Sequence, residues 1–293
     1  MIDHKRITIR NKEESHLHSG LYCVPTPIGN LADITLRALE VLTHCDAVVC
    51  EDSRVSGKLL SAYGIKDKKK IIYNDHADEY IKSKIMTMVE AGQIIALISD
   101  AGTPLVSDPG YKLVRDCLDK GLNVTALPGA NAVLPALQLS GIPCDQFIFG
   151  GFLPAKDKAL RDVLSRYKNT MQTLIFYDSP KRVEKTLFAI DDIMGNRQVA
   201  LVREISKLYE ESIRGTAADI INTIQAKPIK GEIVLVIAGA DEQAAEMNVD
   251  AMIMQSLYSG GSVKDIAKDL AEITGLKKKD LYNRAMALRD NEG

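Results

Sequence analysis

Residues 94–110 read IIALISDAGTPLVSDPG and combine the two features that decide the fold. The first part is an almost unbroken apolar run, which is typical of a central parallel strand covered on both faces. The second part, from Ser99 to Gly110, gathers Gly, Pro, Ser, Thr and Asp, which favour tight turns and supply polar contacts. We therefore expect a buried strand that ends in a ligand-binding loop.

An alternation of strands and helices extends upstream and downstream of this segment. Strands are predicted at residues 20–26, 46–52, 70–74, 94–100 and 123–129. Helices are predicted at residues 34–45, 53–64, 78–92 and 111–121, and residues 130–141 complete this half of the chain. Asp33 stands in front of the first of these helices and is expected to be its N-cap. This alternation predicts an α/β domain over residues 20–143.

The alternation resumes after Pro143. Strands are predicted at residues 146–152, 172–178, 198–204 and 231–239, with helices at 156–167, 180–195 and 215–225. Residues 144–240 are therefore expected to form a second α/β domain. Residues 248–293 are expected to form a small helical domain with turns at Ser259–Ser262 and Gly275, and residues 1–19 a flexible leader.

Composition narrows the class of protein. The 293 residues are 46% hydrophobic and 26% charged, with a formal net charge of −2, as in soluble globular proteins. No apolar run reaches the roughly 18 residues that a membrane helix needs. The five cysteines are scattered and form no CxxC pair, which favours a reducing cytoplasm over a disulfide framework or a zinc site.

Three loops follow predicted strands and are rich in Gly, Pro and small polar residues. They span residues 25–35, 99–110 and 127–132, and parallel strands would bring them to one edge of a sheet. Neither a dinucleotide fingerprint nor a P-loop is present, and the GxSxG and HExxH patterns are missing as well. The five histidines have no metal-ligand spacing, so no metal is expected.

Seven segments occur in an order that resembles the tetrapyrrole-methylase superfamily. Within it they resemble the branch that 2′-O-methylates a cytidine in the decoding region of 16S rRNA. The segments are TPIGNLADITLRALEVL (26–42), CEDSR (50–54), SDAGTPLVSDPG (99–110), LPGANAVLPAL (127–137), GFLP (151–154), FYDSPKR (176–182) and GEIVLVIAG (231–239). The family usually has SPHR where this chain has Lys181, which keeps a positive charge but puts a role for an imidazole in doubt.

The resemblance implies two α/β domains with S-adenosylmethionine in the cleft between them, followed by a small C-terminal helical domain. It also implies a cytoplasmic homodimer whose partner is 16S rRNA within the small ribosomal subunit. The implied cofactor-binding residues are Pro27, Ile28, Gly29, Asp100, Ala101, Gly102, Thr103, Val106, Asn131, Ala132 and Asp178.

The CEDSR segment supplies the candidates for proton transfer. A ribose 2′-hydroxyl is a weak acid, so a base or a nearby cation helps its proton to leave. Glu51, Asp52 and Arg54 are polar residues at the end of a predicted buried strand and are the catalytic candidates. The alternative is that they form an ordinary salt-bridged strand end.

RNA contacts would have to come from local basic patches, because the net charge is slightly negative. A preassembled subunit with a shaped target would reconcile this charge with RNA specificity. Lys277, Lys278 and Lys279 form a further basic group in the tail. The RNA-binding candidates after the GFLP and FYDSP segments are Lys156, Lys158, Arg161, Lys181 and Arg182, with Arg166, Lys168 and Lys185 nearby.

Two other functions stay open at this stage. A tetrapyrrole could be the methyl acceptor, although the first loop reads TPIGN instead of the glycine-rich GxGxGD of that branch. The tail could also be a helix-turn-helix of a ligand-sensing regulator that binds nucleic acid. Asp265, Asp269 and Glu272 are interleaved with its basic residues, which disfavours a DNA-recognition helix.

Overall fold

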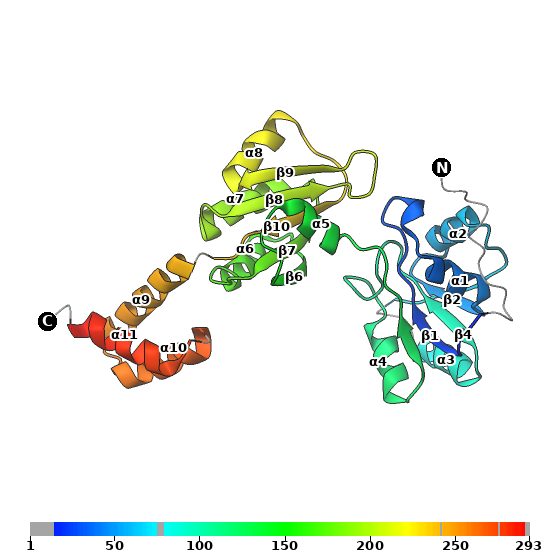
Figure 1. Cartoon of the computed structure of the whole chain (residues 1–293), viewed down its shortest axis with the longest axis horizontal. Coiled ribbons are helices and arrows are strands. Elements are labelled where there is room, and N and C mark those ends of the chain that lie inside the picture. The colour runs from blue at the N-terminus through cyan, green and yellow to red at the C-terminus, as the bar shows by residue number, and fades with distance from the viewer. Residues whose placement is uncertain (1–14, 75–78, 241, 275, 291–293) are drawn as a thin grey trace.

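The computed structural model describes residues 15–74, 79–240, 242–274 and 276–290. Figure 1 shows an elongated molecule with one sheet near the N-terminus, a second sheet in the middle and a group of helices at the C-terminal end. None of the helices formed by these residues is long and apolar enough to cross a membrane. The two sheets position the candidate site.

The first sheet contains five strands, all parallel, in the order β3-β2-β4-β1-β5. They are β1 (Gly20–Cys23), β2 (Ala47–Cys50), β3 (Lys69–Ile72), β4 (Ile94–Leu97) and β5 (Val124–Ala126). The central strand β4 continues the apolar run that begins at Ile94, and three of its four residues are buried. The five strands predicted for this half of the chain are confirmed.

Four helices cover the two faces of this sheet, as the apolar character of the strands requires. They are α1 (Leu36–His44), α2 (Ser53–Ala62), α3 (Glu79–Glu90) and α4 (Tyr111–Asp119). Val41 of α1 and Leu60 of α2 are buried in the core on one face. Ile85 of α3 and Leu113 of α4 are buried in the core on the other face.

The expected N-cap of α1 is wrong by two residues. Asn30 accepts a hydrogen bond from the backbone N–H of Ala32 and starts a short 3₁₀ turn, η2 (Leu31–Asp33). Asp33 lies inside this turn, so it cannot cap the helix. Thr35 is the N-cap instead, and its hydroxyl accepts a hydrogen bond from the N–H of Ala38 at 3.1 Å.

The second sheet is mixed, in the order β6-β7-β10-β8-β9. Its strands are β6 (Phe147–Phe152), β7 (Thr173–Asp178), β8 (Gln198–Arg203), β9 (Glu211–Thr216) and β10 (Ile233–Ile237). β6 and β7 are parallel, whereas β10 is antiparallel to both of its neighbours. The sequence did not predict β9, because its residues are mostly polar and half-buried. This edge strand is held by its six-residue pairing with β8.

Helices cover both faces of the second sheet. On one face lie α6 (Asp157–Arg166), α7 (Val183–Met194) and α8 (Ala217–Ala226), which bury their apolar sides in a single core. The opposite face is covered by α5 (Val133–Ser140), whose Val133, Ala136 and Leu137 are buried against strands β7, β8 and β10. The periodicity groups this helix with the first domain, but the structure packs it on the second sheet. Its apolar side chains find their partners there.

The tail contains α9 (Glu242–Tyr258), α10 (Val263–Thr274) and α11 (Lys278–Asp290). These helices form a core of their own, with Ile253, Ile266 and Leu281 among its buried residues. The first of them begins at Glu242, six residues before the predicted start of the helical tail. The predicted turn at Gly275 falls outside the described residues.

Part of the expected leader is packed against the first domain. Leu17 contacts the core beneath α1, and the backbone carbonyl of His18 accepts a hydrogen bond from the Tyr22 hydroxyl at 2.8 Å. The carbonyl of Ser19 accepts another from the Asn123 side chain at 3.0 Å. Residues 1–14, which make up the rest of the leader, lie outside the described part of the chain.

Candidate active site

The loops singled out in the sequence meet at one edge of the first sheet. Loop 25–35 follows β1, loop 99–110 follows β4 and loop 127–132 follows β5. β4, β1 and β5 are adjacent and parallel, so the three loops leave the sheet side by side. The CEDSR segment follows β2, the neighbour of β4 on its other side.

Hydrogen bonds fasten these loops to one another. Thr26 and Gly102 form a two-way backbone bridge in which both N···O distances are 2.9 Å. The hydroxyl of Ser99 donates to the carbonyl of Gly102 at 3.1 Å, and that of Thr103 donates to the carbonyl of Ala130 at 3.0 Å. The three loops therefore form one connected platform, which is what a preorganised binding site requires.

Loop 99–110 contains backbone conformations that side chains normally avoid. Leu105 has a φ of 71° and Ser107 a φ of 66°, both in the left-handed region. Each such residue costs on the order of 1 kcal/mol, and strain of this kind is concentrated at ligand sites. Gly102 and Gly110 also have positive φ values, so the loop turns sharply at both ends.

Gly129 allows loops 25–35 and 127–132 to approach closely. A Cβ atom added there would lie 2.6 Å from the Cβ of Pro25, whose ring is stiff. We expect Gly129→Ala to lower the free energy of unfolding by roughly 1–3 kcal/mol, because a loop must shift to relieve the overlap. Urea unfolding would measure the change.

Gly57 provides a matched control for this substitution. It lies inside α2, where an added Cβ has open space. Gly57→Ala should leave stability unchanged or raise it by up to about 1 kcal/mol, because alanine is the better helix former. Equal destabilisation by the two substitutions would show that the contact between Gly129 and Pro25 is not the cause.

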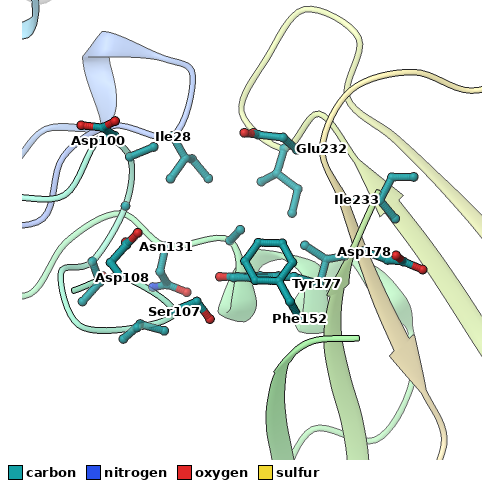
Figure 2. A pocket seen from close by; sticks show the side chains of 17 residues that line it. Ile28, Asp100, Ser107, Asp108, Asn131, Phe152, Tyr177, Asp178, Glu232 and Ile233 are labelled. Carbon is teal, nitrogen blue, oxygen red and sulfur yellow. The ribbon is translucent and has the colours of Figure 1, made fainter. Parts of the chain in front are cut away.

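The second sheet supplies the opposite wall of a cavity of about 270 Å³. This wall is built from the ends of β6 and β7 and the start of β10. Figure 2 shows Asp108 and Asn131 on one side and Phe152 and Tyr177 on the other. The volume of the cavity lies just below the usual range for small-molecule sites, ~300–1,000 Å³. We call this space between the two sheets the cleft.

Nine of the eleven residues that resemblance suggested for cofactor binding line the cleft. These are Ile28, Asp100, Ala101, Gly102, Thr103, Val106, Asn131, Ala132 and Asp178. Pro27 and Gly29 are not among the lining residues. The other lining residues lie outside that set of eleven and are Ser107, Asp108, Phe152, Tyr177, Ile205, Glu232, Ile233 and Val234.

Asp178 lines the cleft, but its carboxylate does not face the cleft. The side chain is 0% exposed, and in Figure 2 it points away from the opposite wall. One carboxylate oxygen accepts hydrogen bonds from the N–H of Ser179, at 2.8 Å, and from the guanidinium of Arg182. The carboxylate of Asp178 is therefore part of the second domain's interior, and only the rest of the residue is available to a ligand.

The cleft has an acidic character. Asp100, Asp108 and Glu232 line it, and no Lys, Arg or His is found among the described residues that do so. Glu232 is paired with Lys207 at 2.8 Å, whereas among the described residues Asp100 accepts one hydrogen bond, from the backbone N–H of Asp52 at 3.3 Å. Such a lining attracts a cationic ligand and repels an anionic one.

Asp108 has an unusually high pKa for an aspartate. Burial, followed by the negative charge of Glu51, raises its pKa to about 6, and Asp100 adds to the effect. Burial raises the pKa of the neighbouring Tyr177 to about 12, with a further contribution from the charge of Asp108. Tyr177 therefore keeps its proton at neutral pH, while Asp108 is ionised there and becomes neutral in mild acid.

The three catalytic candidates lie beside the cleft but do not line it. Asp52 is the N-cap of α2 and pairs with Arg54 at 2.7 Å, so these two residues satisfy one another. The hydrogen bonds from Arg54 hold the pKa of Asp52 at about 2. Glu51 is exposed, and its charge acts on Asp108. The alternative of a salt-bridged strand end thus describes Asp52 and Arg54, but not Glu51.

The candidates for RNA contact divide into two groups. Arg161 is paired with Asp157 and Asp192, and Arg182 with the buried Asp178. Lys156, Lys158 and Lys181 are exposed, and none of the ion pairs formed by the described residues includes them. The three lysines are therefore the members of the set that are free to meet a phosphate group.

Comparison with known proteins gives two family matches. Residues 20–221 match the tetrapyrrole (corrin/porphyrin) methylases, and residues 243–289 match a family described as the RsmI C-terminal HTH domain. The second description agrees with the helices of the tail. The first match covers most of both sheets.

Curated relatives are similar to this chain over nearly its whole length. A protein of Erythrobacter litoralis is 48% identical over 93% of this chain and 96% of its own length. Relatives from Rickettsia prowazekii and Escherichia coli O157:H7 are each 41% identical and cover 92% and 91% of this chain, and 94% of their own lengths. All three are called ribosomal RNA small subunit methyltransferase I.

Solved structures show the same fold at low sequence identity. A cobalt precorrin-4 methyltransferase aligns with a TM-score of 0.54 at 17% identity, over 74% of this chain and 94% of its own. A diphthine synthase aligns with a TM-score of 0.56 at 14% identity, over 78% of this chain and 93% of its own. These likenesses bear on the fold alone.

Proposed function

Because this chain belongs to the tetrapyrrole methylase family, we propose that it transfers a methyl group from S-adenosylmethionine to 16S rRNA of the small ribosomal subunit. The acceptor is the ribose 2′-oxygen of a cytidine in the decoding region. The names of the three relatives support the substrate, since each covers more than nine-tenths of this chain. The match of the tail to a domain described for the same enzyme also supports it.

The acidic cleft is the observation that supports the cofactor. S-adenosylmethionine supplies a methyl group on a positively charged sulfonium, and it carries an ammonium as well. Asp100 and Asp108 offer two carboxylates to these charges, and no basic residue among the described lining opposes them. Glycine-rich turns expose backbone N–H groups of the kind that bind a carboxylate, but the N–H of Gly102 itself already donates to the carbonyl of Thr26 at 2.9 Å. Ile28, Ile233 and the other apolar lining residues suit an adenosine group and exclude water.

The chain's own contribution to methyl transfer is mainly alignment. The sulfonium is already reactive, so the platform of hydrogen-bonded loops has to hold donor and acceptor in line. The proton of the acceptor hydroxyl must leave as the new bond forms. Of the three candidates for this role, Glu51 is proposed as the acceptor of that proton, since Asp52 and Arg54 already satisfy each other.

The assembled subunit is proposed as the substrate, in preference to naked rRNA. A protein with a net charge of −2 lacks the broad basic surface that usually binds naked RNA. Lys156, Lys158 and Lys181 provide local contacts that a prearranged target could use. The resemblance to the family supports a cytoplasmic homodimer, whose mass light scattering would measure.

Methyl transfer from labelled S-adenosylmethionine tests this function. Purified small subunits that lack the modification, their naked rRNA and a tetrapyrrole acceptor would be compared at equal enzyme concentration. We expect rapid labelling of the subunits, slower labelling of naked rRNA and none of the tetrapyrrole. Labelling of the tetrapyrrole alone would overturn the proposed substrate and leave the methyltransferase fold standing.

A further inference from the structure

Phe152 is a large apolar side chain that the fold leaves exposed at the mouth of the cleft. It is the last residue of β6, it lines the cleft, and it is 61% exposed. Single exposed apolar residues are common on protein surfaces and need no explanation by themselves. Phe152 differs from such residues, because the local backbone conformation directs its ring toward the cleft.

Two glycines bring Phe152 to this position. A Cβ on Gly150 would lie 2.2 Å from a ring carbon of Phe176, so only glycine lets β6 pass this close to β7. Gly151 has a φ of 69°, and the register between β6 and β7 shifts between Phe149 and Phe152. The irregularity turns the strand end toward the cleft, as β-bulges beside functional sites commonly do.

The Phe152 ring packs against the ring of Tyr177. Its centroid lies 5.2 Å from that of Tyr177, with an angle of 64° between the ring planes. Tyr177 makes a similar edge contact with Phe149, at 4.9 Å and 65°. The backbone is fixed just beyond, where the N–H of Leu153 donates to the carbonyl of Tyr177 at 3.1 Å. The ring therefore packs against Tyr177 on one side, as Figure 2 shows, while much of it stays open to a ligand.

Exposed lysines follow the two strands that supply Phe152 and Tyr177. Phe152 and Tyr177 are register partners on parallel strands, so the segments that follow them leave the sheet together. Lys156 follows Phe152 by four residues and Lys181 follows Tyr177 by four, and both are exposed. An open aromatic ring at one strand end, with exposed lysines in the segments that follow both strands, suits a ligand that combines a planar base with phosphates.

We propose that Phe152 is a stacking platform for the base of the nucleotide that is methylated. Resting on the proposed function, this inference assigns the recognition of the flipped-out base to the second domain, while the first domain holds the methyl donor. A single-stranded base that leaves its neighbours in RNA is commonly held by stacking on an aromatic side chain. Phe152 is thus a substrate-positioning residue that acts through the base, away from the reacting atoms.

Four variants separate stacking from other roles of this ring. Phe152→Ala removes the ring, Phe152→Leu keeps an apolar side chain without a π face, and Phe152→Trp keeps a π face. Phe188→Ala is the matched control, because Phe188 is 51% exposed on α7 and does not line the cleft. For each variant, thermal melting checks folding, calorimetry gives the S-adenosylmethionine Kd without RNA, and subunit methylation gives kcat and KM.

Loss of stacking should lower kcat/KM for small subunits by about 5- to 150-fold in the Ala and Leu variants, mainly through a higher KM. The Trp variant should stay within about threefold of the unaltered enzyme, and the Phe188 variant should match it. The Kd for S-adenosylmethionine should change less than twofold in all of them.

Three results would overturn the inference. One is a parallel loss of S-adenosylmethionine affinity in Phe152→Ala, which would mean that the ring holds the adenine of the methyl donor. Another is full activity of Phe152→Leu, which would reduce the role to apolar packing. The third is unchanged kcat/KM in both the Ala and Leu variants. If the unaltered enzyme does not label subunits, the proposed function fails, and this inference fails with it.

Discussion

Replacing Asp108 by Asn is expected to weaken the binding of S-adenosylmethionine at pH 7.5 by roughly 10- to 100-fold. The substitution keeps the shape of the side chain and removes one of the two carboxylates that line the cleft and have no basic ion-pair partner among the described residues. A hydrogen bond or ion contact to a charged group contributes on the order of 1.5–3 kcal/mol, which corresponds to this loss. Titration calorimetry would measure it.

S-adenosylhomocysteine shows which positive charge Asp108 faces. This product keeps the ammonium but lacks the sulfonium charge. If the carboxylate faces the sulfonium, Asp108→Asn should weaken product binding much less than it weakens binding of the methyl donor. Equal losses for both would place the carboxylate beside the ammonium. Unchanged affinity for both would contradict the electrostatic account of the cleft.

The raised pKa of Asp108 makes this affinity depend on pH. Since the carboxyl has a pKa of about 6, it becomes neutral as the pH falls below that value. Affinity for S-adenosylmethionine should therefore fall between pH 7 and pH 5, and this dependence should be much weaker in Asp108→Asn. Glu51→Gln should move the midpoint to lower pH, because the negative charge of Glu51 contributes to the raised pKa.

The raised pKa of Asp108 also predicts that Asp108→Asn makes the cofactor-free protein more stable. A carboxyl whose folded pKa lies above its unfolded value of 3.8 favours folding only while it is protonated. Its contribution is therefore lost as the pH rises through about 6, and ionised Asp108 destabilises the folded protein at neutral pH. Asp108→Asn should raise the free energy of unfolding at pH 7.5 by on the order of 1 kcal/mol, a figure reduced to allow for partial solvent exposure. Asp145→Asn, at an exposed position, is the control and should change little.

Replacing Arg182 by Ala is expected to lower the free energy of unfolding by roughly 3 kcal/mol. The Asp178 carboxylate is 0% exposed, and Arg182, whose side chain is 27% exposed, is its ion-pair partner. The second carboxylate oxygen has no hydrogen-bond partner among the described residues, so the guanidinium is the main source of compensation. Without it a buried charge is left unpaired. Urea unfolding at neutral pH would give the change.

Two further variants test this cause. Lys181→Ala removes the adjacent exposed cation and should leave stability unchanged, while subunit binding weakens. Adding Asp178→Asn to Arg182→Ala replaces the unpaired charge by a neutral amide, so the double variant should be more stable than the single one. A double variant that is less stable than Arg182→Ala would show that the arginine acts through packing and not through charge.

The first domain could be predicted from the sequence almost completely. Its strands are short apolar runs, its loops are marked by Gly and Pro, and parallel pairing then dictates that the loops share one edge. Local patterns carry all of this information. The N-cap of α1 was misplaced, because the turn started by Asn30 competes with a cap at Asp33.

The second wall of the cleft could not be predicted in the same way. Phe152 and Tyr177 have the composition of ordinary core residues, and only the irregular end of β6 and the packing of the two sheets turn them toward the cleft. The direction of the Asp178 side chain depends on Arg182, and the partner of α5 depends on tertiary packing. These features are set by contacts distant in sequence or by local geometry that no periodicity encodes.

The identity of the methylated nucleoside decides whether this chain is a ribose methyltransferase of 16S rRNA. Small subunits that lack the modification would be incubated with the enzyme and labelled S-adenosylmethionine, and their rRNA digested to nucleosides for mass spectrometry. The account predicts a single labelled product, 2′-O-methylcytidine, formed by the unaltered enzyme and strongly reduced in Asp108→Asn. Label on a base, on a ribosomal protein or on a nucleoside other than cytidine would contradict it.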